Sequence, residues 1–213
     1  MAVKYYPLYL NLVDRSVLVV GAGAVATQKI PGLLAAGARL RVVAPAASAE
    51  IRAWAGAGRL EWRERPYETA DLEGAALVFA AASDRAVHER VWREARERGL
   101  WVNVVDVPAL CDFIAPSIVR QGELQIAVST GGAAPALAKL LRRKLEAVLG
   151  PEYGELVRLA GAWRPEILKL PKEERRALWE RFASDSFLEL IRSEGAARAE
   201  ARLKEWIHGK RPL

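Results

Sequence analysis

Two aspartates stand directly after apolar runs of the sequence and could handle protons. Asp106 follows the run 101–105 in the string Asn-Val-Val-Asp-Val-Pro, and Asp84 follows the run 76–82 in Ala-Ala-Ser-Asp-Arg. If these runs are strands of an open parallel sheet, both aspartates lie at its carboxyl edge, where such sheets bind ligands. A carboxylate in that position can accept or release a proton during a reaction.

Each aspartate also has a simpler structural interpretation. Asp84 precedes a helical pattern, and ordinary capping preferences predict that it caps that helix. Asp106 could bond its own backbone in a turn, but its position at the mouth of a cleft favours a functional carboxylate. The neighbouring Ser83 is predicted to lie beside a bound cofactor.

A glycine-rich turn is the second candidate site. Residues 16–29 read Ser-Val-Leu-Val-Val-Gly-Ala-Gly-Ala-Val-Ala-Thr-Gln-Lys, a strand that enters a helix through two glycines. In this pattern the first glycine permits a tight turn, the second lets a pyrophosphate approach, and the small Ala26 lets the helix pack on the strand. The first helical N–H groups then face the anion. An ordinary strand-to-helix turn is the alternative; on the dinucleotide interpretation the binding residues are Gly21, Gly23, Ala24 and Val25.

Several other kinds of site find no support in the sequence. Cys111 is the only cysteine, and His88 and His208 are far apart, so neither an internal disulfide nor a metal site is predicted. His88 lies in a charged helical pattern and is expected at the surface. No tyrosine is followed four residues later by lysine, and neither a Gly-x-Ser-x-Gly elbow nor a P-loop ending occurs. The candidate proton-handling group is therefore a carboxylate.

Composition and charge limit the partners. Hydrophobic residues make up 52% of the 213 residues, which is typical of a globular protein. No apolar run reaches the length of a membrane span and the start lacks a signal-peptide core, so we expect a cytoplasmic protein without a membrane partner. The formal charge of +6 arises mostly in residues 114–213, which hold 18 basic and 13 acidic side chains. Because glutamates interleave these basic residues, no nucleic-acid partner is predicted, whereas an acidic small molecule fits the charge.

The first half of the chain alternates strand-like and helical patterns. This alternation predicts the α/β fold class, with a Rossmann-type doubly wound parallel sheet. The run 60–65 alternates apolar and polar residues, as a half-exposed edge strand does. Pro31 is expected to kink the first helix or to remove one of its hydrogen bonds. The five predicted strands are residues 16–20, 39–44, 60–65, 76–82 and 101–105.

The pattern changes after Pro108. Residues 117–130 predict a hairpin that turns at Gln121-Gly122, and residues 136–149 predict a helix with leucines along one side. Because this small unit cannot bury both of its faces, we expect it to pack on the first domain or to form a homodimer through residues 114–149. The remainder is helical by pattern, with its tryptophans as core anchors and breaks expected near Pro165, Pro171 and Gly195. The predicted domains are residues 1–113, 114–149 and 150–213.

Five short blocks occur together and in order. They are Val-Gly-Ala-Gly-Ala-Val-Ala-x-x-Lys, Ala-Ala-Ser-Asp, Asn-Val-Val-Asp-x-Pro, Phe-Ile-Ala-Pro-Ser-Ile and Val-Ser-Thr-Gly-Gly-x-x-Pro. From about residue 6 to residue 149 the chain closely resembles the siroheme synthase dehydrogenase/chelatase family, and the helical tail does so in outline. Gln28, Pro31 and His88 depart from the residues common in that family. We expect the methyltransferase domain fused to some relatives to be absent.

The resemblance implies a function and site residues. It implies precorrin-2 dehydrogenase, the NAD-dependent oxidation of precorrin-2 to sirohydrochlorin, and some members also insert ferrous iron as a substrate in a ferrochelatase reaction. Asp106 matches the family's functional aspartate and would accept protons in both steps. Pro45 and Ala46 are expected near the adenosine end of NAD. Strand two ends without an acidic residue that would bind a ribose 2′-hydroxyl, and no arginine follows immediately to hold the 2′-phosphate of NADP. The tetrapyrrole-binding residues implied are Asn103, Ser117, Arg120 and Thr130.

The basic second half agrees with this interpretation. Precorrin-2 carries eight carboxylates, so cationic side chains near the cleft would attract it. Candidates besides Arg120 are Lys139, Arg142 and Arg143, which could equally form a solvated helix face. The competing hypothesis is a non-catalytic NAD-sensing module that passes the bound state to a partner. The Asn-Val-Val-Asp-x-Pro block argues against it, because a sensor needs no proton acceptor.

Overall fold

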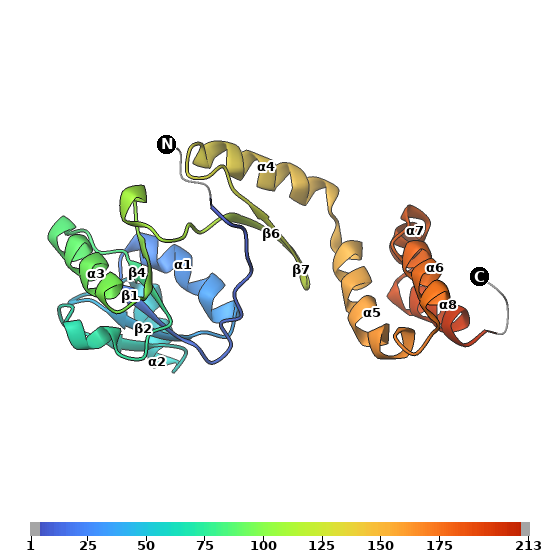
Figure 1. Ribbon diagram of the computed structural model, residues 1–213, viewed down its shortest axis with the longest axis horizontal. Helices are drawn as coiled ribbons and strands as arrows, with labels where there is room; N and C mark the ends of the chain where they lie inside the picture. Colours follow the sequence, from blue (N-terminus) through green and yellow to red (C-terminus); the bar gives the residue numbers. More distant parts are fainter. Residues whose placement is uncertain (1–4, 210–213) are drawn as a thin grey trace. The chain divides into compact units, whose positions relative to one another are not determined.

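The structure, a computed structural model, describes residues 5–209. The chain divides into two compact units, Met1–Ala115 and Pro116–Leu213, and each is described by itself (Figure 1). The division falls two residues beyond the predicted end of the first domain.

A five-stranded parallel sheet forms the centre of the first unit. Its strand order is β3-β2-β1-β4-β5, and every neighbouring pair is parallel. This confirms the predicted Rossmann-type sheet and places β3 at an edge, as its alternating pattern indicated. β1 has its predicted bounds, and the other four strands are slightly shorter than expected. The strands are β1 Ser16–Val20, β2 Arg39–Val43, β3 Glu61–Arg63, β4 Leu77–Ala80 and β5 Trp101–Val104.

Alternate side chains of each strand fill two separate cores, one on each face of the sheet. Val17 and Val19 of β1 join a core that includes Ile30 of helix α1 (Ala24–Ala35). Leu18 of β1 joins the opposite core with Val91 of helix α3 (Arg85–Glu97). Helix α2 (Ala49–Gly56) covers the first face beside α1, through its buried Ile51. Short 3₁₀ turns occupy Thr69–Leu72 (η1) and Pro108–Leu110 (η2).

Some predictions for the helices of the first unit are confirmed by the structure and one is wrong. Asp84 caps α3 as predicted, because its carboxylate accepts a hydrogen bond of 2.8 Å from the Ala86 N–H. Helix α1 continues through Pro31 to Ala35, so the proline removes a backbone donor without ending the helix. The expectation for His88 was wrong: it is 9% exposed, and its Nε2 has no hydrogen-bond partner among the described residues. His88 lies on the same face of α3 as Val91 and Ala95, three and seven residues later, so the helix directs it toward the sheet.

The second unit begins with an antiparallel hairpin. Strands β6 (Ser117–Gln121) and β7 (Leu124–Val128) pair from Ser117 opposite Val128 to Gln121 opposite Leu124. The turn is therefore Gly122-Glu123, one residue later than predicted, because Gln121 still pairs within the hairpin. Gly122 takes a φ of +56°, which glycine adopts without strain.

Within the described residues, which end at Gly209, five helices follow the hairpin. Helix breaks lie near Pro165, Pro171 and Gly195 as predicted, although α5 continues two residues beyond Pro165. The helix boundary at Ser184 was not predicted. The Ser184 side chain caps the next helix by accepting a hydrogen bond from the Phe187 N–H. The helices are α4 Pro135–Val148, α5 Pro151–Ile167, α6 Lys172–Phe182, α7 Asp185–Glu194 and α8 Ala196–His208.

The last four helices enclose a core of their own. Leu159, Leu178, Phe187 and Leu203 are at most 2% exposed, and several tryptophans pack around them. These tryptophans are thus core anchors, as their spacing indicated. Helix α4 differs, because much of its apolar side is exposed at Leu137, Leu140, Leu141 and Val148.

Within residues 5–209, no helix is both long enough and apolar enough to span a membrane.

Candidate dinucleotide and proton-transfer site

The turn between β1 and α1 has the geometry of an anion cradle. Gly21 has a φ of +106°, and a Cβ atom there would lie 2.4 Å from the Ala81 carbonyl oxygen, so only glycine fits. A Cβ on Gly23, by contrast, would meet nothing within 4 Å. Gly23 is also the N-cap of α1, and it provides no side-chain cap for the first helical N–H groups. The open space and the uncapped helix start leave room for a phosphate group at the positive end of the helix.

Two neighbouring loops lie against this turn. The loop after β2, which holds the exposed Pro45 and Ala46, is tied to the turn by a hydrogen bond of 3.0 Å from the Ser48 N–H to the Ala22 carbonyl oxygen. The Ser48 hydroxyl also lies 2.9 Å from the hydroxyl of Thr27 on α1. This link was not predicted, although a serine at the position that caps α2 is visible in the sequence.

The loop after β4 joins the same edge. Ala81 donates its N–H to the Val20 carbonyl oxygen at 2.7 Å, and its own carbonyl packs against Gly21. The exposed Ser83 follows two residues later. The loops after β1, β2 and β4 therefore meet at the carboxyl edge of the sheet, and the predicted cofactor residues all lie on these three loops or in the first turn of α1.

Asp106 lies at the same edge, after β5. The chain remains paired with β4 through Val105, whose N–H bonds to the Ala80 carbonyl oxygen at 2.9 Å. Asp106 then takes a φ of +60°, an uncommon conformation for a residue other than glycine. No hydrogen bond from residues 5–209 reaches its exposed carboxylate, so it is not the self-bonded turn aspartate of the simpler interpretation. Such a carboxylate is free to accept a proton from a ligand.

A folded-back segment supports Asp106. The Cys111 thiol donates to the carbonyl oxygen of Val104 at 3.1 Å, and burial raises the pKa of this thiol, so it stays protonated. Asn103 is only 7% exposed and donates its amide N–H to the Phe113 carbonyl oxygen at 2.8 Å. The predicted substrate residue Asn103 therefore also fixes the segment that follows β5.

The other predicted substrate residues belong to the second unit. Arg120 is exposed on β6, and Ser117 is half-buried at its start. The Thr130 hydroxyl accepts a hydrogen bond of 3.1 Å from the Ala134 N–H, which shapes the loop before α4. The convergence of these three residues with Asp106 remains a prediction.

Lys29 is a functional candidate that was not among the predicted site residues. It lies on α1, and its Nζ is 5.5 Å from the centroid of the Phe79 ring on β4. Burial lowers the pKa of Lys29, while the acidic groups of Cys111 and Asp106 act in the opposite direction. The sequence marked it only as the lysine that ends the first of the five blocks, and that position does not by itself predict a contact with β4.

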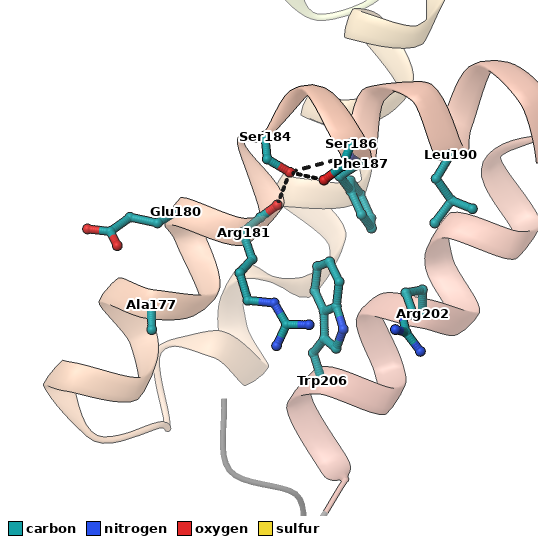
Figure 2. Close-up of a pocket in the computed structure, with 9 residues that line it drawn as sticks. All are labelled: Ala177, Glu180, Arg181, Ser184, Ser186, Phe187, Leu190, Arg202 and Trp206. Carbon is teal, nitrogen blue, oxygen red and sulfur yellow. Dashed lines mark hydrogen bonds between the residues drawn. The ribbon is translucent and has the colours of Figure 1, made fainter.

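The second unit contains a cavity of about 670 Å³ between α6, α7 and α8. Figure 2 shows the Arg181 guanidinium beside the Trp206 ring, whose centroid lies 4.2 Å away. The Ser184 hydroxyl donates to the Arg181 carbonyl oxygen at 2.7 Å, so this cavity is braced by internal contacts.

No cluster of three or more metal-ligating side chains occurs in the described part of the chain.

The parallel sheet, the glycine cradle and the uncapped helix define a Rossmann-type dinucleotide-binding protein. Three family models match successive parts of the chain: NAD_binding_7, an NAD(P)-binding family, at residues 8–117; the sirohaem biosynthesis protein central region at 121–147; and the sirohaem synthase dimerisation region at 152–207. The chain belongs to the NAD(P)-binding family NAD_binding_7, in the domain arrangement of the siroheme synthase family.

Individual relatives agree with this assignment. The chain is 41% identical over 206 residues to siroheme synthase of Neisseria meningitidis serogroup C, covering 96% of this chain and 43% of that protein. It is 42% identical over 207 residues to siroheme synthase of Pseudomonas aeruginosa, covering 96% and 44%. The chain therefore spans less than half the length of these relatives. The solved structure of SirC, a precorrin-2 dehydrogenase, matches with a TM-score of 0.79 and 28% identity, over 94% of this chain and all of that one.

Proposed function

We propose that this protein is an NAD-dependent precorrin-2 dehydrogenase that forms sirohydrochlorin. The observation that carries the proposal is the match to SirC, a precorrin-2 dehydrogenase, over that protein's entire chain. The free carboxylate of Asp106 at the dinucleotide edge supplies the matching chemistry. Siroheme synthases are longer than this chain, so their remaining activities are not part of the proposal.

The cradle fits the cofactor. Gly21 holds the tight turn, Gly23 leaves the space above α1 open, and the α1 N–H groups face that space. NAD bound there would supply the hydride acceptor of the oxidation. Pro45 and Ala46 would border its adenosine end, and Ser83 would lie along it.

Asp106 is the proposed proton acceptor. Oxidation of precorrin-2 removes a hydride and a proton, and the Asp106 carboxylate would take the proton as the hydride leaves. Its exposed side chain and its left-handed backbone conformation directly after β5 support this role. Arg120, with Lys139, Arg142 and Arg143, would attract the carboxylates of the tetrapyrrole.

A turnover assay tests the proposal directly. Purified protein mixed with precorrin-2 and NAD should form NADH and sirohydrochlorin in equal amounts. Folded protein that binds NAD but gives no turnover would instead support the non-catalytic NAD-sensing module. A titration with sirohydrochlorin separates the two hypotheses further, since a sensor has no reason to bind a tetrapyrrole.

Insertion of ferrous iron into sirohydrochlorin is a separate hypothesis that rests on Asp106. Metal entry displaces two pyrrole protons, and one exposed carboxylate could accept them in turn. A rate with ferrous ion equal to that of a protein-free mixture would remove this activity.

The proposed assembly is a homodimer, and the proposed location is the cytoplasm. The family match to the sirohaem synthase dimerisation region and the exposed leucines of α4 support the homodimer. The family description refers to residues 152–207, whereas the exposed leucines lie in the predicted segment 114–149. Both segments are therefore candidates for the contact.

A further inference from the structure

The Lys29 ammonium is held in place but lacks a counter-ion. Its Nζ lies over the buried Phe79 ring at 5.5 Å from the centroid. Phe79 is itself fixed edge-to-face against Phe113, with 5.3 Å between the ring centroids. Among residues 5–209 no carboxylate lies within ion-pair distance of this ammonium.

A partly buried cation without a partner is unfavourable, because desolvation is not repaid by a close opposite charge. Here burial lowers the pKa of Lys29, and the more distant Cys111 and Asp106 offset this only in part. Cys111 adds little negative charge, since burial raises its own pKa. The aromatic face of Phe79 contributes a weak cation–π attraction. The charge is thus under-compensated in the chain alone.

The position of Lys29 indicates what would compensate it. Lys29 lies on the helix whose start forms the cradle. Asp106, at the end of β5, is close enough for its charge to raise the pKa of Lys29. Both flanking features belong to the proposed ligand edge. We propose that the Lys29 ammonium is a positioning group that binds an anionic oxygen of a ligand held between the glycine turn and Asp106.

This inference rests on the proposed function, which offers two sources of that anionic oxygen. One is a carboxylate of the tetrapyrrole, and the other is the pyrophosphate of NAD. Binding titrations with sirohydrochlorin alone and with NAD alone distinguish the sources. Neither titration needs turnover, so the effect of Lys29 on ligand affinity can be measured even if the dehydrogenase assay fails.

Three variants test the inference. Lys29→Met keeps an unbranched side chain but removes the charge, and Lys29→Arg keeps the charge. Lys172→Met is the matched control, because it removes an exposed lysine charge from α6 in the second unit.

We expect Lys29→Met to weaken binding of one of the two ligands about tenfold, the usual value of a hydrogen bond to a charged group. Lys29→Arg should restore most of that affinity, and Lys172→Met should match the parent. The melting temperature of ligand-free Lys29→Met should equal or exceed that of the parent, because an unpaired charge is lost.

Three results would overturn the inference. The first is unchanged affinity of Lys29→Met for both ligands. The second is equal weakening by the arginine and methionine variants. The third is a lower melting temperature of ligand-free Lys29→Met, which would assign the lysine a structural role.

Discussion

A Cβ atom on Gly21 would lie 2.4 Å from the carbonyl oxygen of Ala81, whereas one on Gly23 would meet open space. The two glycines of one turn therefore serve different ends. Gly21 lets β1 turn beside the loop after β4, and Gly23 leaves open the space in which we propose that a phosphate lies.

This difference predicts opposite phenotypes for two alanine variants. Gly21→Ala should destabilise folding by about 3 kcal/mol or more, because it combines a backbone clash with a positive φ. Gly23→Ala should cost about 1 kcal/mol or less in stability but weaken NAD binding at least about tenfold, because its methyl group enters the ligand space. Urea denaturation and NAD titration of both variants measure the effects. Normal NAD affinity in Gly23→Ala would place the cofactor elsewhere.

Replacement of the Asp106 carboxylate should separate binding from chemistry. Asp106→Asn should lower kcat by about 100-fold or more, the usual contribution of a general base, while NAD affinity stays within about twofold. Asparagine tolerates the left-handed conformation, so the fold should be retained. Asp84→Asn is the control, since asparagine also caps helices and turnover should be preserved. If Asp106→Asn turns over like the parent, another group accepts the proton.

The exposed side of α4 predicts where dimer contacts lie. A double variant, Leu137→Gln with Leu141→Gln, should shift the protein toward monomer at micromolar concentration, because polar side chains weaken an apolar interface. Lys144→Gln on the same helix should leave the mass unchanged. Light scattering measures both. A dimer that survives the double substitution would point to residues 152–207, the part that the family description names.

Asp71 predicts an acid-dependent loss of stability in the first unit. Burial alone would raise the pKa of this carboxyl, but hydrogen bonds from Arg65, the Glu68 N–H and Arg63 outweigh burial and lower the pKa to about 2. Because the folded-state pKa lies below the ordinary value of 3.8, the carboxylate stabilises the fold fully above about pH 4. This contribution, about 2 kcal/mol, should disappear as the pH falls toward 2.

Urea denaturation across that pH range measures the effect, with Asp71→Asn as the comparison. The variant should be less stable by about 2–4 kcal/mol at neutral pH, since the buried side chain at this position would no longer offer an anion to Arg63 and Arg65. Its stability should also change less between pH 4 and pH 2. An equal loss in parent and variant would assign the acid sensitivity to other carboxyl groups.

Local features of the sequence determined much of the fold and part of the site. The apolar runs predicted all five parallel strands, and alternation of polarity identified β3 as one of the two edge strands. Gly21 and Gly23 marked the cradle, and Asp84 marked the start of α3. These signals are readable because strand burial, tight turns and helix caps depend on residues within a few positions of one another.

Only the tertiary structure decided the remaining features. It placed Lys29 over Phe79, turned His88 inward, and brought Gly154 so close to the Gln121 carbonyl oxygen that a Cβ would lie 2.7 Å from it. It also showed that the Asp106 carboxylate receives no hydrogen bond from the described residues, and that Asn103 fixes the segment after β5. Each of these depends on packing between elements distant in sequence, which no short-range pattern encodes.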